Sequence, residues 1–191
     1  MDLLEESIVP EEARAVKQEA REFAEEHIEP NAAASFERGE YPWEIIEKGM
    51  DAGLVAQEIS EEYGGRGFSL AETLAIAEEF YRADAGLALS LQLPGFGTNI
   101  VEEHGSEEQK EEFLRPVAEN EQISGLAVSE PDTGSDMAGM TTEAELDGDE
   151  WVLNGEKYWV GNGVEADWLT LYAKTGDDPD NRYGNYSLFI V

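Results

Sequence analysis

The chain of 191 residues has no cysteine and only two histidines. Without cysteine it has no disulfide, no thiol nucleophile and no thiolate metal site. His27 and His104 each lack a second histidine at ligand spacing, so we interpret both as structural or surface residues and expect no metal ion. The sequence also has no GxGxxG after a strand and no GKS or GKT loop, which excludes the Rossmann and P-loop classes.

Positive charge is scarce. The chain has 12 lysines and arginines against 44 aspartates and glutamates, which gives a net charge of −32. Such a charge repels nucleic acid and anionic membranes, so we exclude both as partners. The acids are spread along the whole chain. Together with so few lysines, this favours a halophilic source over an ordinary acidic protein, because molar salt shortens the Debye length to roughly 3 Å.

Long hydrophobic runs are also absent. No segment approaches the length of a transmembrane helix, and the N-terminal MDLLEESIVPEEAR lacks the apolar stretch of a signal peptide. We therefore expect a cytoplasmic protein. With 41% hydrophobic residues, the chain can still build a core.

The first 120 residues carry helical patterns. Apolar residues recur at intervals of three and four, and two capping boxes mark helix starts. In the second helix, Trp43, Ile46 and Met50 should share one side. The expected helices begin at or span Pro10–Ile28, Pro42, Ser69–Glu72, Asp84–Leu93 and Ser106–Gln109.

From residue 121 onward, short apolar stretches alternate with turn formers, and Asp147-Gly148 predicts a tight turn. Glu143, Glu145 and Asp149 should face water. We therefore predict an α+β fold, with an all-helical domain at 1–120 and a mostly antiparallel, β-barrel-like, incomplete domain at 121–191. The expected strands are Ile123–Val128, Thr141–Leu146, Trp151–Asn154, Tyr158–Val160, Trp168–Lys174 and Tyr186–Val191.

Two motifs in this second part carry the chemistry. The first is Gly125–Met140, where the apolar run Leu126–Val128 ends at a Ser-Glu-Pro sequence and a polar loop follows. Pro131 cannot donate to a sheet ladder, and the residues after it are dense in turn formers. A loop rich in backbone N–H groups and hydroxyls is suited to hold phosphate. The second motif is KYWVGNG at Lys157–Gly163.

The two motifs, their order and the helical region before them resemble the acyl-CoA dehydrogenases. Pro42-Trp43, Glu62–Gly65 and Glu103–Lys110 fit the same family. The resemblance implies a flavoprotein oxidoreductase of fatty acid metabolism with FAD as cofactor, which removes hydrogen from the α and β carbons of an acyl-CoA thioester. It also implies electron-transferring flavoprotein as electron acceptor and a homotetramer when complete.

The resemblance further implies which residues contact the flavin. Ser129 replaces the family's usual Thr and can keep its hydrogen bond to the ring. Ser135 lies near the pyrophosphate and the thioester ligand, so it also counts as substrate-binding. Gly161 stands where a hydroxyl residue usually donates to flavin N5, and it offers only a backbone N–H. Taken alone, the serine could mark a plain strand exit, the glycines could be turn glycines, and the tryptophan could be a core residue. The full candidate set is Leu126, Val128, Ser129, Gly134, Ser135, Trp159, Val160 and Gly161.

The segment at residues 85–99 is apolar and rich in small residues, so buried core is its default interpretation. In the family this region helps to line the acyl pocket. Leu91, Leu93 and Phe96 are therefore further candidates for substrate binding.

The family's chain is roughly twice as long, and its usual catalytic glutamate lies in a C-terminal domain beyond residue 191. We therefore name no catalytic residue and expect no turnover from these residues alone. If the chain carried its own base, the glutamates to test would be Glu79, Glu102, Glu103 and Glu130. The alternatives are a non-catalytic flavin-binding or assembly fragment and an acyl-CoA oxidase-like relative.

The charge generates a first prediction. At low ionic strength, repulsion among 44 acids should destabilise the folded chain, and salt should screen it. Unfolding followed by circular dichroism, from dilute buffer to molar KCl, should show a midpoint that rises with salt. A flat or falling midpoint would remove the argument for salt adaptation.

Overall fold

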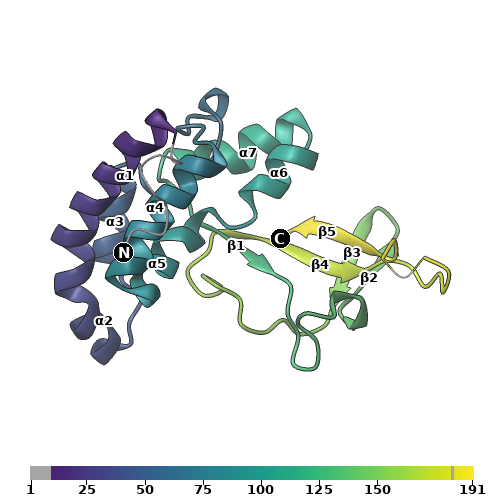
Figure 1. Ribbon diagram of the computed structural model, residues 1–191. Helices are drawn as coiled ribbons and strands as arrows, with labels where there is room; N and C mark the ends of the chain where they lie inside the picture. Colours follow the sequence, from purple (N-terminus) through teal and green to yellow (C-terminus); the bar gives the residue numbers. More distant parts are fainter. Residues whose placement is uncertain (1–9, 182) are drawn as a thin grey trace. The chain divides into compact units, whose positions relative to one another are not determined.

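The computed structural model describes residues 10–181 and 183–191. The chain divides into two compact units with the boundary between Gln122 and Ile123, and each unit is described by itself. Figure 1 shows that helices make up the first unit and strands the second. The fold is therefore α+β, with the helical part first, as expected.

Seven α-helices make up most of the described part of the helical unit. The expected capping boxes are confirmed, since Ser69 and Ser106 each accept from the third helical N–H while Glu72 and Gln109 reach back to them. Asp84 caps the helix that begins at Ala85, because its side chain accepts a hydrogen bond from the N–H of Leu87. The helices are α1 (Glu11–Phe23), α2 (Ala32–Arg38), α3 (Trp43–Asp51), α4 (Leu70–Ala83), α5 (Ala85–Gln92), α6 (Thr98–His104) and α7 (Glu107–Ala118), and a π-helical turn, Ala24–Ile28, continues α1.

Helices α1 and α4 lie side by side at the core of this unit (Figure 1). Ala13 of α1 packs against Ala75 of α4, both fully buried, so the two backbones approach closely at this point. Further along, the rings of Phe23 and Phe80 lie 5.4 Å apart. A pair of small residues and a pair of aromatic rings thus both contribute to this interface.

A buried carboxylate fastens the same two helices. Glu79 of α4 is fully buried. Its carboxylate accepts hydrogen bonds from Arg21 Nη2 of α1 at 2.7 Å and from Arg82 Nε at 3.1 Å. Lys17 Nζ lies 3.7 Å away. Burial raises the pKa of Glu79, but hydrogen bonds from Arg21 and Arg82 outweigh it and hold the pKa below its ordinary value. Glu79 is therefore an ionised structural group.

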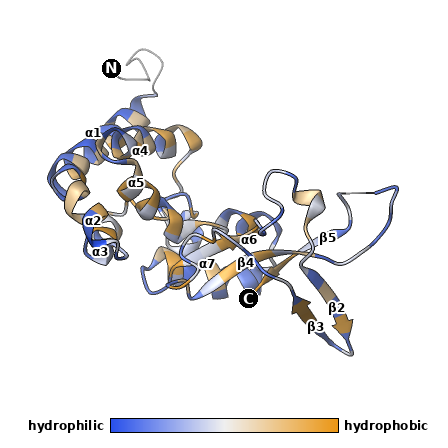
Figure 2. Ribbon diagram, turned by 90° about the horizontal axis from the view of Figure 1, so that it is seen from below, coloured by the Kyte–Doolittle hydropathy of each residue, from blue (hydrophilic) through white to orange (hydrophobic). Residues whose placement is uncertain are grey.

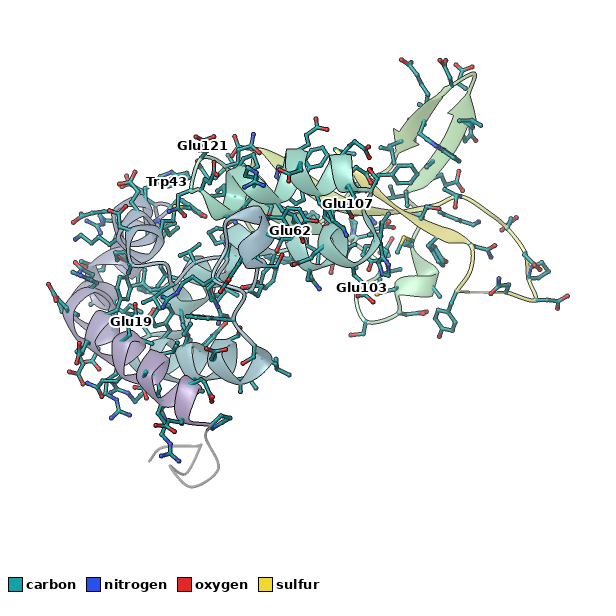
Figure 3. All side chains as sticks on the ribbon, turned by 90° about the horizontal axis from the view of Figure 1, so that it is seen from above. Glu19, Trp43, Glu62, Glu103, Glu107 and Glu121 are labelled. Carbon is teal, nitrogen blue, oxygen red and sulfur yellow. The ribbon has the colours of Figure 1, made fainter. Side chains whose placement is uncertain are left out.

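The surface of the helical unit is acidic and carries one exposed tryptophan. The acids labelled in Figure 3 come from several of its elements, so negative charge is distributed over the unit. Trp43 was expected to share one side of α3 with Ile46 and Met50; it is 38% exposed, and its ring meets that of Tyr41 edge-on. Ile46 and Met50 are buried, together with Ile45 and Gly49.

The β unit is a mixed, open sheet, which corrects the expectation of a mostly antiparallel barrel. Two of its pairings are parallel, β1 with β4 and β2 with β4, and two are antiparallel, β2 with β3 and β4 with β5. Long connections before β2 and β4 permit the parallel pairings, which hairpins cannot make. The strands are β1 (Ser124–Ala127), β2 (Glu143–Asp147), β3 (Glu150–Asn154), β4 (Trp168–Lys174) and β5 (Tyr186–Ile190).

The β2–β3 hairpin turns where the sequence predicted it. Gly148 has φ +70° in the turn, a conformation that favours glycine, and Glu143, Glu145 and Asp149 are exposed as expected. β2 meets β4 through the single pair Glu143–Lys174, so the hairpin diverges from the rest of the sheet (Figure 2).

The expected strand Tyr158–Val160 is wrong, because no strand forms at these residues. Trp159 has φ +58°, in the left-handed region, and this conformation interrupts any pleat. Aromatic and β-branched residues favour strands, but at this point the backbone turns, so the prediction from residue type was wrong.

The Glu79 cluster generates a prediction about stability. Replacing Arg21 with Met leaves a fully buried carboxylate with fewer partners, so the free energy of unfolding should fall by about 2 kcal/mol. Lys48→Met, which removes an exposed pair with Glu44, should change it by less than about 1 kcal/mol. Urea unfolding in molar KCl measures both. Equal effects of the two substitutions would contradict the structural role of Glu79.

Candidate functional site

The segment from Ser129 to Ser135 leaves strand β1 and turns at once. The N–H of Glu130 donates to the carbonyl of Thr133 at 2.7 Å, which closes a tight turn around Pro131. Ser129 is half-buried, while Gly134 and Ser135 are exposed. The two hydroxyls therefore lie at the two ends of a short, constrained loop.

The two motifs singled out from the sequence lie side by side. The N–H of Tyr158 donates to the carbonyl of Ser129 at 2.7 Å, and Lys157 Nζ donates to the carbonyl of Val128 at 3.0 Å. Further along, Asn162 Nδ2 donates to the carbonyl of Ser124 at 3.1 Å. These three hydrogen bonds hold residues 157–162 against the strand β1 and the loop that follows it.

A close backbone approach completes this arrangement. A Cβ on Gly125 would lie 2.8 Å from the carbonyl oxygen of Gly161 and 2.6 Å from Leu169 Cδ2, so only glycine fits at this position of β1. Asn162, which is buried and has φ +60°, makes the turn that follows Gly161. Asparagine tolerates this left-handed conformation better than most residues.

A buried ion pair lies where the two motifs meet. Lys157 Nζ and Glu130 Oε1 are 2.9 Å apart, and their side chains are 7% and 3% exposed. The same carboxylate accepts from the N–H of Thr141 at 2.6 Å, from its Oγ1 at 2.8 Å, and from the N–H of Thr142 at 2.9 Å. Glu130 therefore joins the end of β1, the start of β2 and the second motif.

These hydrogen bonds determine the charge of Glu130. Burial raises its pKa, but hydrogen bonds from Thr142, Thr141 and Lys157 outweigh burial and lower the pKa to about 2. A carboxylate with so low a pKa and so many partners is a poor proton acceptor. Glu130 is thus a structural group and not a base.

Sequence reasoning did not single out Lys157. A signal was present, because a lysine directly precedes the aromatic and apolar residues Tyr158–Val160 in a chain with 12 basic residues. A buried cation requires a buried anion, and the Ser-Glu-Pro sequence supplies one. The pairing of Lys157 with Glu130 could not be deduced without the fold.

Trp159 is the most exposed aromatic residue of the β unit. Its side chain is 88% exposed, and its ring meets Tyr158 edge-on at 5.4 Å. Exposing a large apolar ring to water costs free energy, and so does a left-handed backbone at a residue other than glycine. Features of both kinds concentrate at functional sites. Among the described residues, the N–H groups of Trp159, Val160 and Gly161 donate to no protein acceptor. An aromatic ligand with polar edge atoms would satisfy both the ring and these donors.

The other predicted residues lie in varied environments. Leu126 and Val128 are half-buried at the end of β1. In the helical unit, Leu91 is fully buried and packs against Gly49, where a Cβ would lie 2.6 Å from Leu91 Cδ2. Leu93 is half-buried and Phe96 is 39% exposed. Their role in substrate binding stays a prediction.

Within residues 10–181 and 183–191, no group of three or more His, Asp or Glu side chains could hold a metal ion. His27 packs its ring against Phe23 at 4.9 Å. None of the helices in the described part of the chain is both long and apolar enough to cross a membrane.

Comparison with known proteins identifies both units. Residues 10–121 match the family model of the acyl-CoA dehydrogenase N-terminal domain, and residues 125–191 match that of the middle domain. The chain belongs to the acyl-CoA dehydrogenase family. It is 38% identical to a probable acyl-CoA dehydrogenase of Mycobacterium tuberculosis, over 96% of this chain and 46% of that protein. It is 36% identical to a probable medium-chain specific acyl-CoA dehydrogenase of Caenorhabditis briggsae, over 95% of this chain and 45% of that protein.

Solved structures share the fold. Butyryl-CoA dehydrogenase from Megasphaera elsdenii is 28% identical with a TM-score of 0.85, covering 100% of this chain and 50% of that one. A glutaryl-CoA dehydrogenase from Mycobacterium smegmatis in complex with FADH2 is 30% identical with a TM-score of 0.84, covering 95% and 45%. An electron transferring flavoprotein structure from Acidaminococcus fermentans is 30% identical with a TM-score of 0.86, covering 100% and 49%. The chain spans about half the length of the relatives that it matches.

The low pKa of Glu130 predicts a pH dependence. The folded pKa of about 2 lies below the ordinary value of 4.5, so the ionised carboxylate stabilises the fold at neutral pH. That stability, about 3 kcal/mol at most, is lost as pH falls from roughly 4.5 toward 2. Unfolding of wild type and Glu130→Gln between pH 7 and pH 3, in molar KCl, should show the difference between them shrinking as the pH falls. A constant difference would contradict the assigned charge.

Proposed function

We propose that this chain supplies part of the flavin and acyl-CoA site of an FAD-dependent acyl-CoA dehydrogenase, which catalyses α,β-dehydrogenation of an acyl-CoA thioester. One observation carries the proposal. Residues 157–162 are hydrogen-bonded to β1 and the residues that follow it, and they present an exposed tryptophan beside backbone N–H groups that have no protein acceptor among the described residues. That arrangement fits a flat, polar-edged ring, and it occurs in a chain of a flavoprotein family.

The residues of this chain would then act as a wall and as donors. Trp159, with Val160 and Gly161, would lie beside the ring, and Ser129 would hydrogen-bond its pyrimidine end. Ser135 and Gly134, on the exposed part of the loop, would approach the pyrophosphate. Leu126 and Val128 would line the approach from β1. When bound, FAD would supply the acceptor for the hydride that leaves the β carbon.

Gly161 distinguishes this chain from the pattern of its family. With no hydroxyl, it would offer only its backbone N–H to the redox edge of a bound flavin. The close approach of Gly125 to the Gly161 carbonyl keeps that segment in place. The donor is therefore fixed by the backbone, without a rotamer to choose.

The substrate would be an acyl-CoA, with Ser135 near the thioester and Leu91, Leu93 and Phe96 as candidates for the acyl pocket. Leu91 contributes through packing, because it is fully buried in the helical unit. We further propose electron-transferring flavoprotein as acceptor and a homotetramer as the assembly. A salt-rich cytoplasm as the setting rests on the net charge of −32.

The flavin proposal is tested by two substitutions in the complete protein. Trp159→Ala and Ser135→Glu should each lower the flavin content of purified protein, because one removes the ring wall and the other places a negative charge near a phosphate. Trp151→Ala, at a 48% exposed tryptophan in the same unit, is the matched control and should keep its flavin. Stoichiometric flavin in all three variants would contradict this placement of the flavin site.

Activity separates the enzyme from its alternatives. Anaerobic addition of a saturated acyl-CoA to the complete protein should bleach the flavin if it is a dehydrogenase. Flavin that binds without bleaching would indicate a non-catalytic flavin protein. Rapid reoxidation by oxygen after bleaching would indicate an oxidase-like relative.

A further inference from the structure

The Lys157–Glu130 ion pair lies in an unusual place for a charge pair. Both side chains are more than nine-tenths buried, in a chain where most charges are acidic and exposed. A buried ion pair is weak as a source of stability, because desolvation costs about as much as the attraction returns. A role in fixing one geometry accounts better for its presence.

The pair fixes the backbone on both sides of the candidate flavin wall. Ser129 lies between Val128, whose carbonyl accepts from Lys157, and Glu130, whose carboxylate pairs with it. Trp159 follows Lys157 by two residues, and the N–H of the intervening Tyr158 donates to the Ser129 carbonyl. A displacement of the lysine would therefore move both Ser129 and Trp159.

Trp159 needs such a constraint. Its ring is 88% exposed, so packing with other side chains does little to hold it. Its backbone has φ +58°, a conformation that persists when the surrounding structure over-determines it. The Lys157 ammonium and the Tyr158–Ser129 hydrogen bond supply that constraint immediately before the tryptophan.

We infer that Lys157 and Glu130 are positioning residues of the flavin site, which hold Ser129 and Trp159 at the spacing that a flavin ring requires. Neither residue touches the flavin; both act through the backbone that they fix. The inference rests on the proposed function, and it assigns to this pair a role that a purely stabilising ion pair would not have.

The first test follows Trp159 without any flavin. The chain is labelled with 5-fluorotryptophan, and its fluorine NMR signals are recorded in molar KCl, with Trp159→Phe to assign the resonance. Lys157→Met should shift or broaden the Trp159 signal and leave that of Trp43 unchanged, and Lys157→Arg should restore it in part. Lys174→Met, which removes the Lys174–Asp177 pair of the same unit, is the matched control and should leave Trp159 unchanged.

The second test measures flavin affinity in the complete protein, stripped of flavin and titrated with FAD by fluorescence. Lys157→Met should raise Kd by about tenfold, equivalent to about 1.4 kcal/mol, with recovery in Lys157→Arg and no change in Lys174→Met. Ile190→Ala, in β5, provides a variant destabilised at another place, and it should lower Tm without raising Kd. If Lys157→Met does not fold, Glu130→Gln replaces it in both tests.

The outcomes are distinct. A lower Tm for Lys157→Met with an unchanged Trp159 signal and unchanged Kd overturns the inference and leaves the pair purely structural. A moved Trp159 signal with a raised Kd supports it. If wild-type protein takes up no FAD while the Trp159 signal still moves, the proposed function fails, and the positioning of Trp159 by Lys157 is retained.

Discussion

The β unit depends on one buried ammonium group. Lys157 Nζ lies between the carboxylate of Glu130 and the carbonyl of Val128, at 2.9 Å and 3.0 Å. Around the same carboxylate are the N–H groups of Thr141 and Thr142, so three separate segments meet at one charge. Removing either charge would leave the other buried without its partner, which costs far more than an exposed pair contributes. The placement of Ser129 and Trp159 follows from this contact.

The helical unit shows the same use of scarce positive charge. Glu79 is fully buried between Arg21 of α1 and Arg82 of α4, and its pKa is lowered in spite of burial. In a chain with net charge −32, acidic residues greatly outnumber basic ones. Which acid receives an arginine or lysine partner is therefore decided by the fold. Each unit thus places basic side chains at a carboxylate that must be ionised when folded. Both arrangements lose stability on acidification, because protonation removes the charge that the cations hold.

Much of the fold could be predicted from local chemistry. The capping boxes at Ser69 and Ser106 and the hairpin turn at Gly148 each depend on residues close in sequence, and each is present in the structure. The prediction of a strand at Tyr158–Val160 was wrong, because the backbone takes a left-handed turn at Trp159 that residue propensities do not specify. A tertiary contact, the Tyr158–Ser129 hydrogen bond, accompanies that turn. The antiparallel barrel failed because strand order depends on long connections, whose course local patterns do not specify.

The sequence by itself determined the family, the order of helices before strands and the two motifs of the candidate site, because these rest on residue types at fixed short spacings. Only the tertiary structure decided that the motifs lie side by side, that Lys157 pairs with Glu130, and that Trp159 faces solvent. The physical reason is that a buried charge must find its partner through the fold. Lys157 and Glu130 are 27 residues apart in the chain, and no local preference brings them to 2.9 Å.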